Sequence, residues 1–216
     1  MRLPQILLAA TALAAAPLVA QQAQNAMAQK PGTRSVAAIT GGSYTADPNH
    51  TLVSWEVDHL GFTPYFGLFG DITGTLTLDP KKPADAKVDM TIPVSKVTTA
   101  NAGLTAHMLR AGKDGGKPDF FGPTPADARF VSTAVKPTGR DKALVTGNLT
   151  LNGITRPVTL DTTFYGAGKM PAAMGGKENV GFEATTTLKR SDFGVTMGIP
   201  LVSDAVTLKI AAAFQK

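Results

Sequence analysis

Hydrophobic and polar residues alternate along most of the chain from Tyr44 to the C-terminus. In the first such stretch Val53, Trp55 and Val57 are separated by polar residues, which puts them on one face of an extended strand. Similar segments cover residues 71–78, 88–95, 145–151, 158–164, 180–188 and 206–214, and a less regular one covers 129–136. The pattern therefore predicts about eight strands, each with one dry and one wet face.

Turn residues separate these strands. The strongest marker is Asn152-Gly153, which is typical of a tight hairpin, although a slightly longer connection stays open. Other turns are expected at 79–81, 136–139 and 166–176. The one extended non-strand region, residues 98–122, places Leu104 and Met108 on one face of a short helix that ends before Gly112.

Eight amphipathic antiparallel strands fit a sandwich or a closed barrel. In both folds the apolar face of each strand is covered, and the strand edges are paired or protected. Small residues on the strands leave room for a ligand inside a barrel or permit sharp coiling; these are Gly70, Gly74, Gly147, Gly181 and Ala184. We therefore expect an all-β fold, an eight-stranded antiparallel barrel with a short helical or loop segment near one end. An outer-membrane barrel is disfavoured because aromatic residues make up only 6% and the polar faces carry charges.

Composition narrows the function. The 216 residues include 43% hydrophobic and 17% charged residues, which indicates a folded globular chain. The absence of cysteine excludes disulfides, thiolate metal sites and a cysteine nucleophile. The formal net charge is +5, but lysines and arginines are scattered among acids rather than clustered, so we expect no nucleic-acid partner.

The N-terminus has the order of a secretory signal: Arg2, an apolar run over 6–20, and small residues up to Ala28. We predict cleavage after Ala28 and export, to a bacterial periplasm or beyond the cell; an uncleaved anchor is the alternative. Removing these 28 residues, which carry one arginine and no acid, leaves 188 residues with net charge +4. Residues 29–43 are expected to form a flexible linker, and 44–216 the barrel domain.

Catalytic and metal-binding patterns are missing from the sequence. The three histidines, His50, His59 and His107, match no zinc spacing, and there is no nucleophile elbow, phosphate loop or dinucleotide fingerprint. We therefore expect neither a catalytic nor a metal site. The block 190–194, Arg-Ser-Asp-Phe-Gly, interrupts the alternation: it either meets a ligand headgroup at the cavity mouth or fixes a turn. Phe120-Phe121 is expected as a lid over the cavity or a plug at the barrel end.

Several motifs in this order resemble the YceI-like family. They are Ala46-Asp47-Pro48 before His50-Thr51, Val53-x-Trp55, Asp58-His59-x-Gly61, Gly67-x-Phe69-Gly70, His107-x-Leu109, Asp119-Phe120-Phe121, the run 147–158 with Asn152-Gly153 and Arg156-Pro157-Val158, and Arg190-Ser191-Asp192-Phe193-Gly194. The resemblance implies a lipocalin-like barrel in the periplasm that holds a polyisoprenoid, a quinone or another long-chain amphiphile, without catalytic activity. The chain departs from the family pattern in an insertion at 110–118 and in Thr124-Pro125, both near the expected lid.

We therefore expect a binding protein rather than an enzyme, acting in transport, storage or stress protection. Candidate ligand-binding residues, chosen from the dry faces and the presumed mouth, are Trp55, Phe66, Phe69, Met90, Ile92, His107, Leu149, Leu160, Phe164, Phe182, Arg190, Phe193, Leu208 and Ile210. The expected partner is a small amphiphilic lipid, with no cofactor other than a bound isoprenoid or quinone, no stable membrane insertion, and a homodimer as one option. The alternatives are a filled barrel serving as an interaction module, or a hydrolase or quinone-modifying enzyme using His107 or His59.

Overall fold

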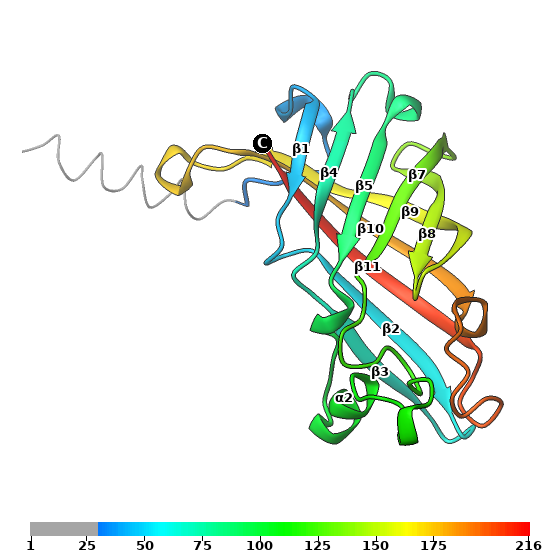
Figure 1. Cartoon of the computed structure of the whole chain (residues 1–216). Helices are drawn as coiled ribbons and strands as arrows, with labels where there is room; N and C mark the ends of the chain where they lie inside the picture. Colours follow the sequence, from blue (N-terminus) through cyan, green and yellow to red (C-terminus); the bar gives the residue numbers. More distant parts are fainter. Residues whose placement is uncertain (1–29) are drawn as a thin grey trace, which may run out of the picture.

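The computed structural model describes residues 30–216, which form one antiparallel sheet closed into a barrel (Figure 1). Its strands are β1 (Gly42–Ala46), β2 (Leu52–His59), β3 (Thr63–Phe69), β4 (Thr73–Leu78), β5 (Lys87–Ile92), β6 (Thr98–Thr99), β7 (Ala128–Pro137), β8 (Lys142–Leu151), β9 (Ile154–Lys169), β10 (Glu178–Lys189) and β11 (Ala205–Gln215). The helices in this range are α2 (Ala102–Met108) and the short 3-10 helices η1 (Val36–Ala38), η2 (Pro83–Asp85), η3 (Val94–Lys96), η4 (Lys113–Gly115), η5 (Ala172–Met174) and η6 (Arg190–Phe193). Within residues 30–216 no helix is long and apolar enough to span a membrane. The predicted signal peptide, residues 1–28, lies outside the described residues.

The sheet closes because β1 pairs with β4 on one side and with β11 on the other. From β1 the ring runs through β4, β5, β7, β8, β9, β10 and β11 and returns to β1. β2, β3 and β6 extend the sheet from β11 toward the end where α2 lies (Figure 1). The predicted fold, an eight-stranded antiparallel barrel with a short helical segment near one end, is confirmed.

Two strands of the barrel sheet, β1 and β3, were not predicted from the sequence, whereas the predicted segments 53–57 and 71–78 correspond to β2 and β4. β1 and β2 both pair with β11, and between them the chain turns at Asp47, whose carbonyl accepts a hydrogen bond from the Thr51 amide at 2.9 Å. The Asp47 carboxylate also lies 2.6 Å from Nδ1 of His50. β3 and β4 are separated at Asp71, which adopts a φ of 54°. The sequence pattern therefore gives one strand where the structure has two, at each of these places.

Buried side chains form two clusters. The first includes residues of β1 and β4, and the second residues of β2 and α2, which lie toward opposite ends of the barrel in Figure 1. The first, which we call the Tyr44 end, contains Ile39, Tyr44, Ala46, Ile72, Leu76, Leu78, Met90, Ala167, Val180 and Phe214. The second, which we call the α2 end, contains Trp55, Val57, Val97, Met108 and Val206. The two apolar layers are the inner faces that the alternation predicts, and they bracket the middle of the barrel.

Part of the segment predicted as a linker packs against the Tyr44 end. Thr33 forms a β-bridge with β9, and Ile39 is buried. Glu178 Oε2 accepts hydrogen bonds from the Thr40 amide and the Tyr44 hydroxyl, each at 3.0 Å. The Thr40 amide is the main cause that holds the pKa of Glu178 below its ordinary value. Residues 33–43 are therefore placed by specific contacts with the barrel.

Local geometry follows the turn and cap chemistry of the sequence. β8 and β9 are joined by the two residues Asn152 and Gly153, whose φ angles of 51° and 75° form the tight hairpin rather than the longer connection. α2 begins after Asn101, whose side-chain oxygen accepts a hydrogen bond from the Leu104 amide at 2.9 Å. The strand expected to be irregular, β7, carries a register shift between Ser132 and Ala134.

Candidate ligand-binding cavity

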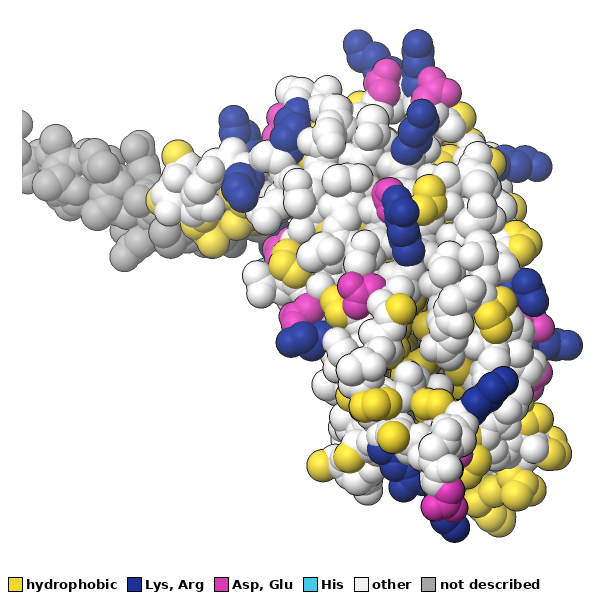
Figure 2. Space-filling model, viewed as in Figure 1, with side chains coloured by type: hydrophobic (Ala, Val, Ile, Leu, Met, Phe, Trp, Pro, Cys, Tyr) yellow, Lys and Arg dark blue, Asp and Glu magenta, His cyan; other side chains and the backbone are white. Residues whose placement is uncertain are grey.

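The barrel encloses a cavity of about 500 Å³, which lies within the range of small-molecule sites. Side chains from β2 to β5 and from β7 to β11 line it, and their exposed atoms are almost entirely aliphatic and aromatic. In Figure 2 hydrophobic side chains are visible inside a hollow on the face shown. The filled-barrel alternative requires an interior occupied by side chains, and the barrel interior is not filled in this way.

Ten of the fourteen predicted residues line this cavity: Trp55, Phe69, Met90, Ile92, Leu149, Leu160, Phe182, Arg190, Leu208 and Ile210. Several of them, such as Leu160 and Ile210, face inward and are still only half-buried, because the empty space leaves part of each side chain uncovered. Their position in the wall follows from the alternation, and their part in ligand binding stays a prediction.

Four predicted residues lie elsewhere. Phe66 is opposite Glu56 in the β2–β3 pair and is 53% exposed, because opposite residues share a face and this one is the outer face. Phe164 packs edge-on against Phe182, with ring centroids 5.9 Å apart, at the Tyr44 end. Phe193 is buried between β9 and β10, and His107 lies on α2 in a polar cluster. For these four residues the structure corrects the sequence-based expectation of cavity lining.

A lid covers the α2 end of the cavity. Leu104 and Met108 from α2 and Phe120 and Phe121 from the following segment all line the cavity. The Phe121 amide donates a hydrogen bond to the Met108 carbonyl at 3.0 Å, which ties the two parts together. Phe120-Phe121 thus has the position expected of a lid. The lining comes from the described part of the chain and includes none of residues 110–118, so the insertion stands outside the wall.

His107 anchors the lid through a polar cluster. Its Nε2 lies 2.6 Å from Oδ2 of Asp119, and Nη2 of Arg110 lies 2.8 Å from the same nitrogen and 3.1 Å from the same oxygen. The His107 ring also meets Phe120 edge-on, with centroids 5.2 Å apart. The contact with His107, and after it the one with Arg110, holds the pKa of Asp119 below its ordinary value. The cluster joins the end of α2 to the residues that close the cavity.

We predict that a bound ligand leaves the cavity faster when Asp119 loses its charge, because the polar cluster that anchors the lid is then weakened. Because the pKa of Asp119 is lowered in the folded protein, its contacts are present above the ordinary carboxyl value of about 4 and are lost as pH falls below it. Asp119→Asn should raise the release rate of a bound prenylquinone at pH 7 severalfold, and acid should do the same in the wild type. Stopped-flow transfer of the ligand to acceptor vesicles measures this rate. Asp114→Asn, an exposed change in the insertion, is the control; equal rates in all three proteins would exclude an anchoring role for the cluster.

Of the two roles that the sequence leaves open for the 190–194 block, the contacts of Arg190 favour the one in which it fixes a turn. It is buried, and its guanidinium donates to the carbonyls of Ser203 at 2.9 Å, Val195 at 3.3 Å, Met197 at 2.8 Å and Val202 at 2.9 Å. Burial lowers the pKa of Arg190. Most of its donors are thus used by the backbone around η6, although its side chain reaches the cavity wall.

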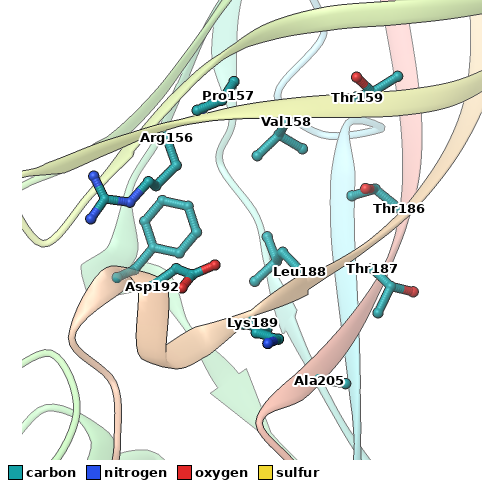
Figure 3. A pocket seen from close by; sticks show the side chains of 11 residues that line it. Arg156, Pro157, Val158, Thr159, Thr186, Thr187, Leu188, Lys189, Asp192 and Ala205 are labelled. Atoms are coloured by element: carbon teal, nitrogen blue, oxygen red, sulfur yellow. The ribbon is translucent and has the colours of Figure 1, made fainter.

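A second pocket, of about 530 Å³, opens in the outer wall between β9 and β10 (Figure 3). The pairing of these strands ends at Asp161 and Thr185, so the strand edges beyond that point diverge. Val158 and Leu188 face each other across the gap in Figure 3 and also line the barrel cavity. Phe193 from η6 also lines this pocket. The wall between this pocket and the cavity is therefore only one side chain thick here.

Potential metal ligands are dispersed in the structure. Within residues 30–216 no group of three or more His, Asp or Glu side chains converges in a way that could hold an ion. His50 contacts Asp47 at the β1–β2 turn, while His59 lies near the end of β2 with its ring 6.3 Å from that of Tyr65. His59 also lines the barrel cavity, whereas His107 lies in the polar cluster with Asp119, so the two histidines considered for catalysis have separate surroundings.

A closed eight-stranded antiparallel barrel around a large apolar cavity defines a lipocalin-like barrel. The sequence model of the YceI-like domain matches residues 44–214, and the chain belongs to this family. A UPF0312 protein of Pseudomonas fluorescens is 37% identical over 185 residues, which cover 80% of this chain and 86% of that protein. A UPF0312 protein of Pseudomonas putida strain W619 is 41% identical over 147 residues, covering 68% of this chain and 71% of the relative.

Solved structures share the architecture. BcnA of Burkholderia cenocepacia superposes with a TM-score of 0.63 at 28% identity, over 78% of this chain and 98% of that one. The YceI protein of Campylobacter jejuni gives 0.60 at 29% identity, over 74% and 89%. A polyisoprenoid binding domain from Saccharophagus degradans gives 0.56 at 13% identity, over 79% and 97%, which is a likeness of fold. The fold is thus shared with proteins of very different sequence.

Proposed function

We propose that this protein binds a long-chain amphiphilic lipid, such as a polyisoprenoid or a prenylquinone, inside the barrel. The observation that carries the proposal is the apolar cavity of about 500 Å³. The polyisoprenoid binding domain from Saccharophagus degradans, which has the same fold, supports this ligand class. The proposed role is carriage or storage of the lipid without chemical change to it.

The cavity wall has the chemistry that a hydrocarbon chain needs. Each methylene moved from water to an apolar site contributes about 0.8 kcal/mol, so roughly ten buried methylenes contribute about 8 kcal/mol before ordering costs. Two of the polar lining residues, Thr51 and Arg190, are already hydrogen-bonded to the backbone. The wall also includes His59, Tyr65 and Thr162, but its exposed atoms are almost entirely apolar. Most of the affinity would therefore come from apolar burial and shape.

A titration with a prenylquinone tests the proposal. Trp55 is the only tryptophan of the chain and lines the cavity, so a quinone bound there should quench the intrinsic emission. We expect saturable quenching that is complete at one equivalent in delipidated protein, with N-acetyltryptophanamide as the control for collisional quenching. Quenching no steeper than that of the control would count against the proposal.

The proposal includes export, because Arg2, the apolar run over 6–20 and the small residues up to Ala28 have the order of a secretory signal. Cleavage after Ala28 would leave a mature chain that begins at Gln29. The intact mass of the protein recovered from the periplasm or the medium tests this part. A mass that retains residues 1–28 would overturn the predicted cleavage and leave the cavity proposal unaffected.

A further inference from the structure

The indole of Trp55 holds a buried hydrogen-bond donor without a partner. Trp55 is 8% exposed and lines the cavity at the α2 end. Among residues 30–216, its Nε1 is the one buried side-chain nitrogen or oxygen for which no hydrogen-bond acceptor lies within reach. Buried polar groups are hydrogen-bonded in nearly all cases, so an exception of this kind needs a physical reason.

Gly67 explains how the indole comes to lie there. Trp55 is opposite Gly67 in the β2–β3 pair, and a Cβ on Gly67 would lie 2.1 Å from Cζ2 and 2.7 Å from Nε1 of the indole. The ring edge that carries the N–H therefore rests directly on the glycine backbone. The backbone of Gly67 is occupied by β-pairing with both β2 and β6, so the strand below the ring supplies no acceptor.

The surroundings of the N–H are apolar on the cavity side as well. Trp55 clusters with Val57, Val97, Met108 and Val206, of which only Met108 carries an acceptor, the weak one of its thioether sulfur. The Tyr65 ring lies 6.4 Å from the indole, but its hydroxyl accepts no hydrogen bond from Nε1. Met108 belongs to α2, and its unbranched thioether side chain adapts readily to a new neighbour. For a ligand oxygen to reach the buried Nε1, Met108 and the adjoining lid residues would have to shift.

We propose that the ligand carries a neutral hydrogen-bond acceptor, such as a carbonyl oxygen, in the part enclosed by the barrel, and that this oxygen accepts the Trp55 indole N–H. The inference rests on the proposed function and specifies its ligand class. A neutral acceptor fits better than a phosphate because the nearest buried cation, Arg190, donates to four backbone carbonyls. Isoprenoid ketones and quinones fit this description, whereas pure hydrocarbons leave the N–H unpaired.

Two matched ligands and one conservative variant test the inference. The probes are farnesylacetone and the hydrocarbon in which a methylene replaces its carbonyl. Because the chain has a single tryptophan, its indole N–H gives one assignable cross-peak in a proton–nitrogen NMR spectrum. We expect the ketone to move this peak downfield and the hydrocarbon to leave it close to its position in the delipidated protein.

Calorimetric affinities provide the second readout. Trp55→Phe keeps an aromatic ring and removes the donor, so it should weaken ketone binding by about threefold to tenfold more than hydrocarbon binding. Phe121→Leu, which alters the cavity wall without touching a donor, should change both affinities by the same factor. Binding of both probes with no peak shift and no selective loss in Trp55→Phe would overturn the inference and leave the proposed function standing. Binding of neither probe would overturn the proposed function, and the inference with it.

Discussion

Replacing Arg190 with alanine should lower the free energy of unfolding by about 3–5 kcal/mol, the largest stability effect that we expect from a single substitution. The guanidinium links four carbonyls that converge from both sides of the turn between β10 and β11. Without it, buried carbonyls lose their donors, and each orphaned group costs about 1–3 kcal/mol unless water replaces the donor. Urea denaturation followed by far-UV circular dichroism measures the change.

Two controls make the result specific. Arg190→Lys retains a charge but places its donors around a single point, so it should recover only part of the loss. Arg140→Ala removes an exposed arginine and should stay within about 0.5 kcal/mol of the wild type. If Arg190→Ala lowered the free energy of unfolding by less than about 1 kcal/mol, the turn would be held by other contacts. The other role considered for Arg190, contact with a ligand headgroup, would then be favoured.

Filling the cavity with Ala184→Phe should weaken prenylquinone binding by about thirtyfold. Ala184 is buried in β10 between Thr162 of β9 and Ile210 of β11, and all three side chains line the cavity. A phenyl ring there takes space from two or three methylenes of a ligand, each worth about 0.8 kcal/mol. Because the ring enters empty space, stability should change by less than about 1.5 kcal/mol.

Thr185→Phe is the matched control, because the neighbouring position on β10 points to the outside of the barrel and is exposed. It adds the same ring to the same strand, and we expect affinity close to that of the wild type. Displacement of the quinone by a fluorescent fatty acid compares the three proteins. Unchanged affinity in Ala184→Phe would show that the ligand binds elsewhere on the molecule.

The alternation of the sequence was enough to predict the wall of the cavity, because a period of two assigns each residue of a regular strand to one face. It placed Met90, Leu208 and Ile210 correctly for that reason. It gave no strand over residues 63–69, so the inward position expected of Phe66 had no pattern behind it; in the structure Phe66 is opposite Glu56 on the outer face. Register is set by pairing between strands, which a single sequence does not display.

Side-chain contacts between segments that are distant in the sequence could not be predicted from the sequence. The carbonyls that surround Arg190 come from residues 195–203, and their approach depends on the path of the turn after η6. The approach of Asp119 to His107 depends on how the segment after α2 returns to the lid. The paired motifs Trp55 and Gly67 contained a signal, since a large ring opposite a glycine is a recognisable cross-strand pair. Only the closed barrel shows that the indole N–H is left without an acceptor.

Native mass spectrometry of the protein purified from its own cells tests the central claim most directly. We predict that the wild-type protein carries one equivalent of an amphiphilic lipid, seen as a single mass increment that solvent extraction removes and added prenylquinone restores. Ala184→Phe, purified in parallel, should appear mostly at the mass of the polypeptide alone. A wild-type protein at the polypeptide mass, with no increment after incubation with prenylquinones or fatty amides, would contradict the account.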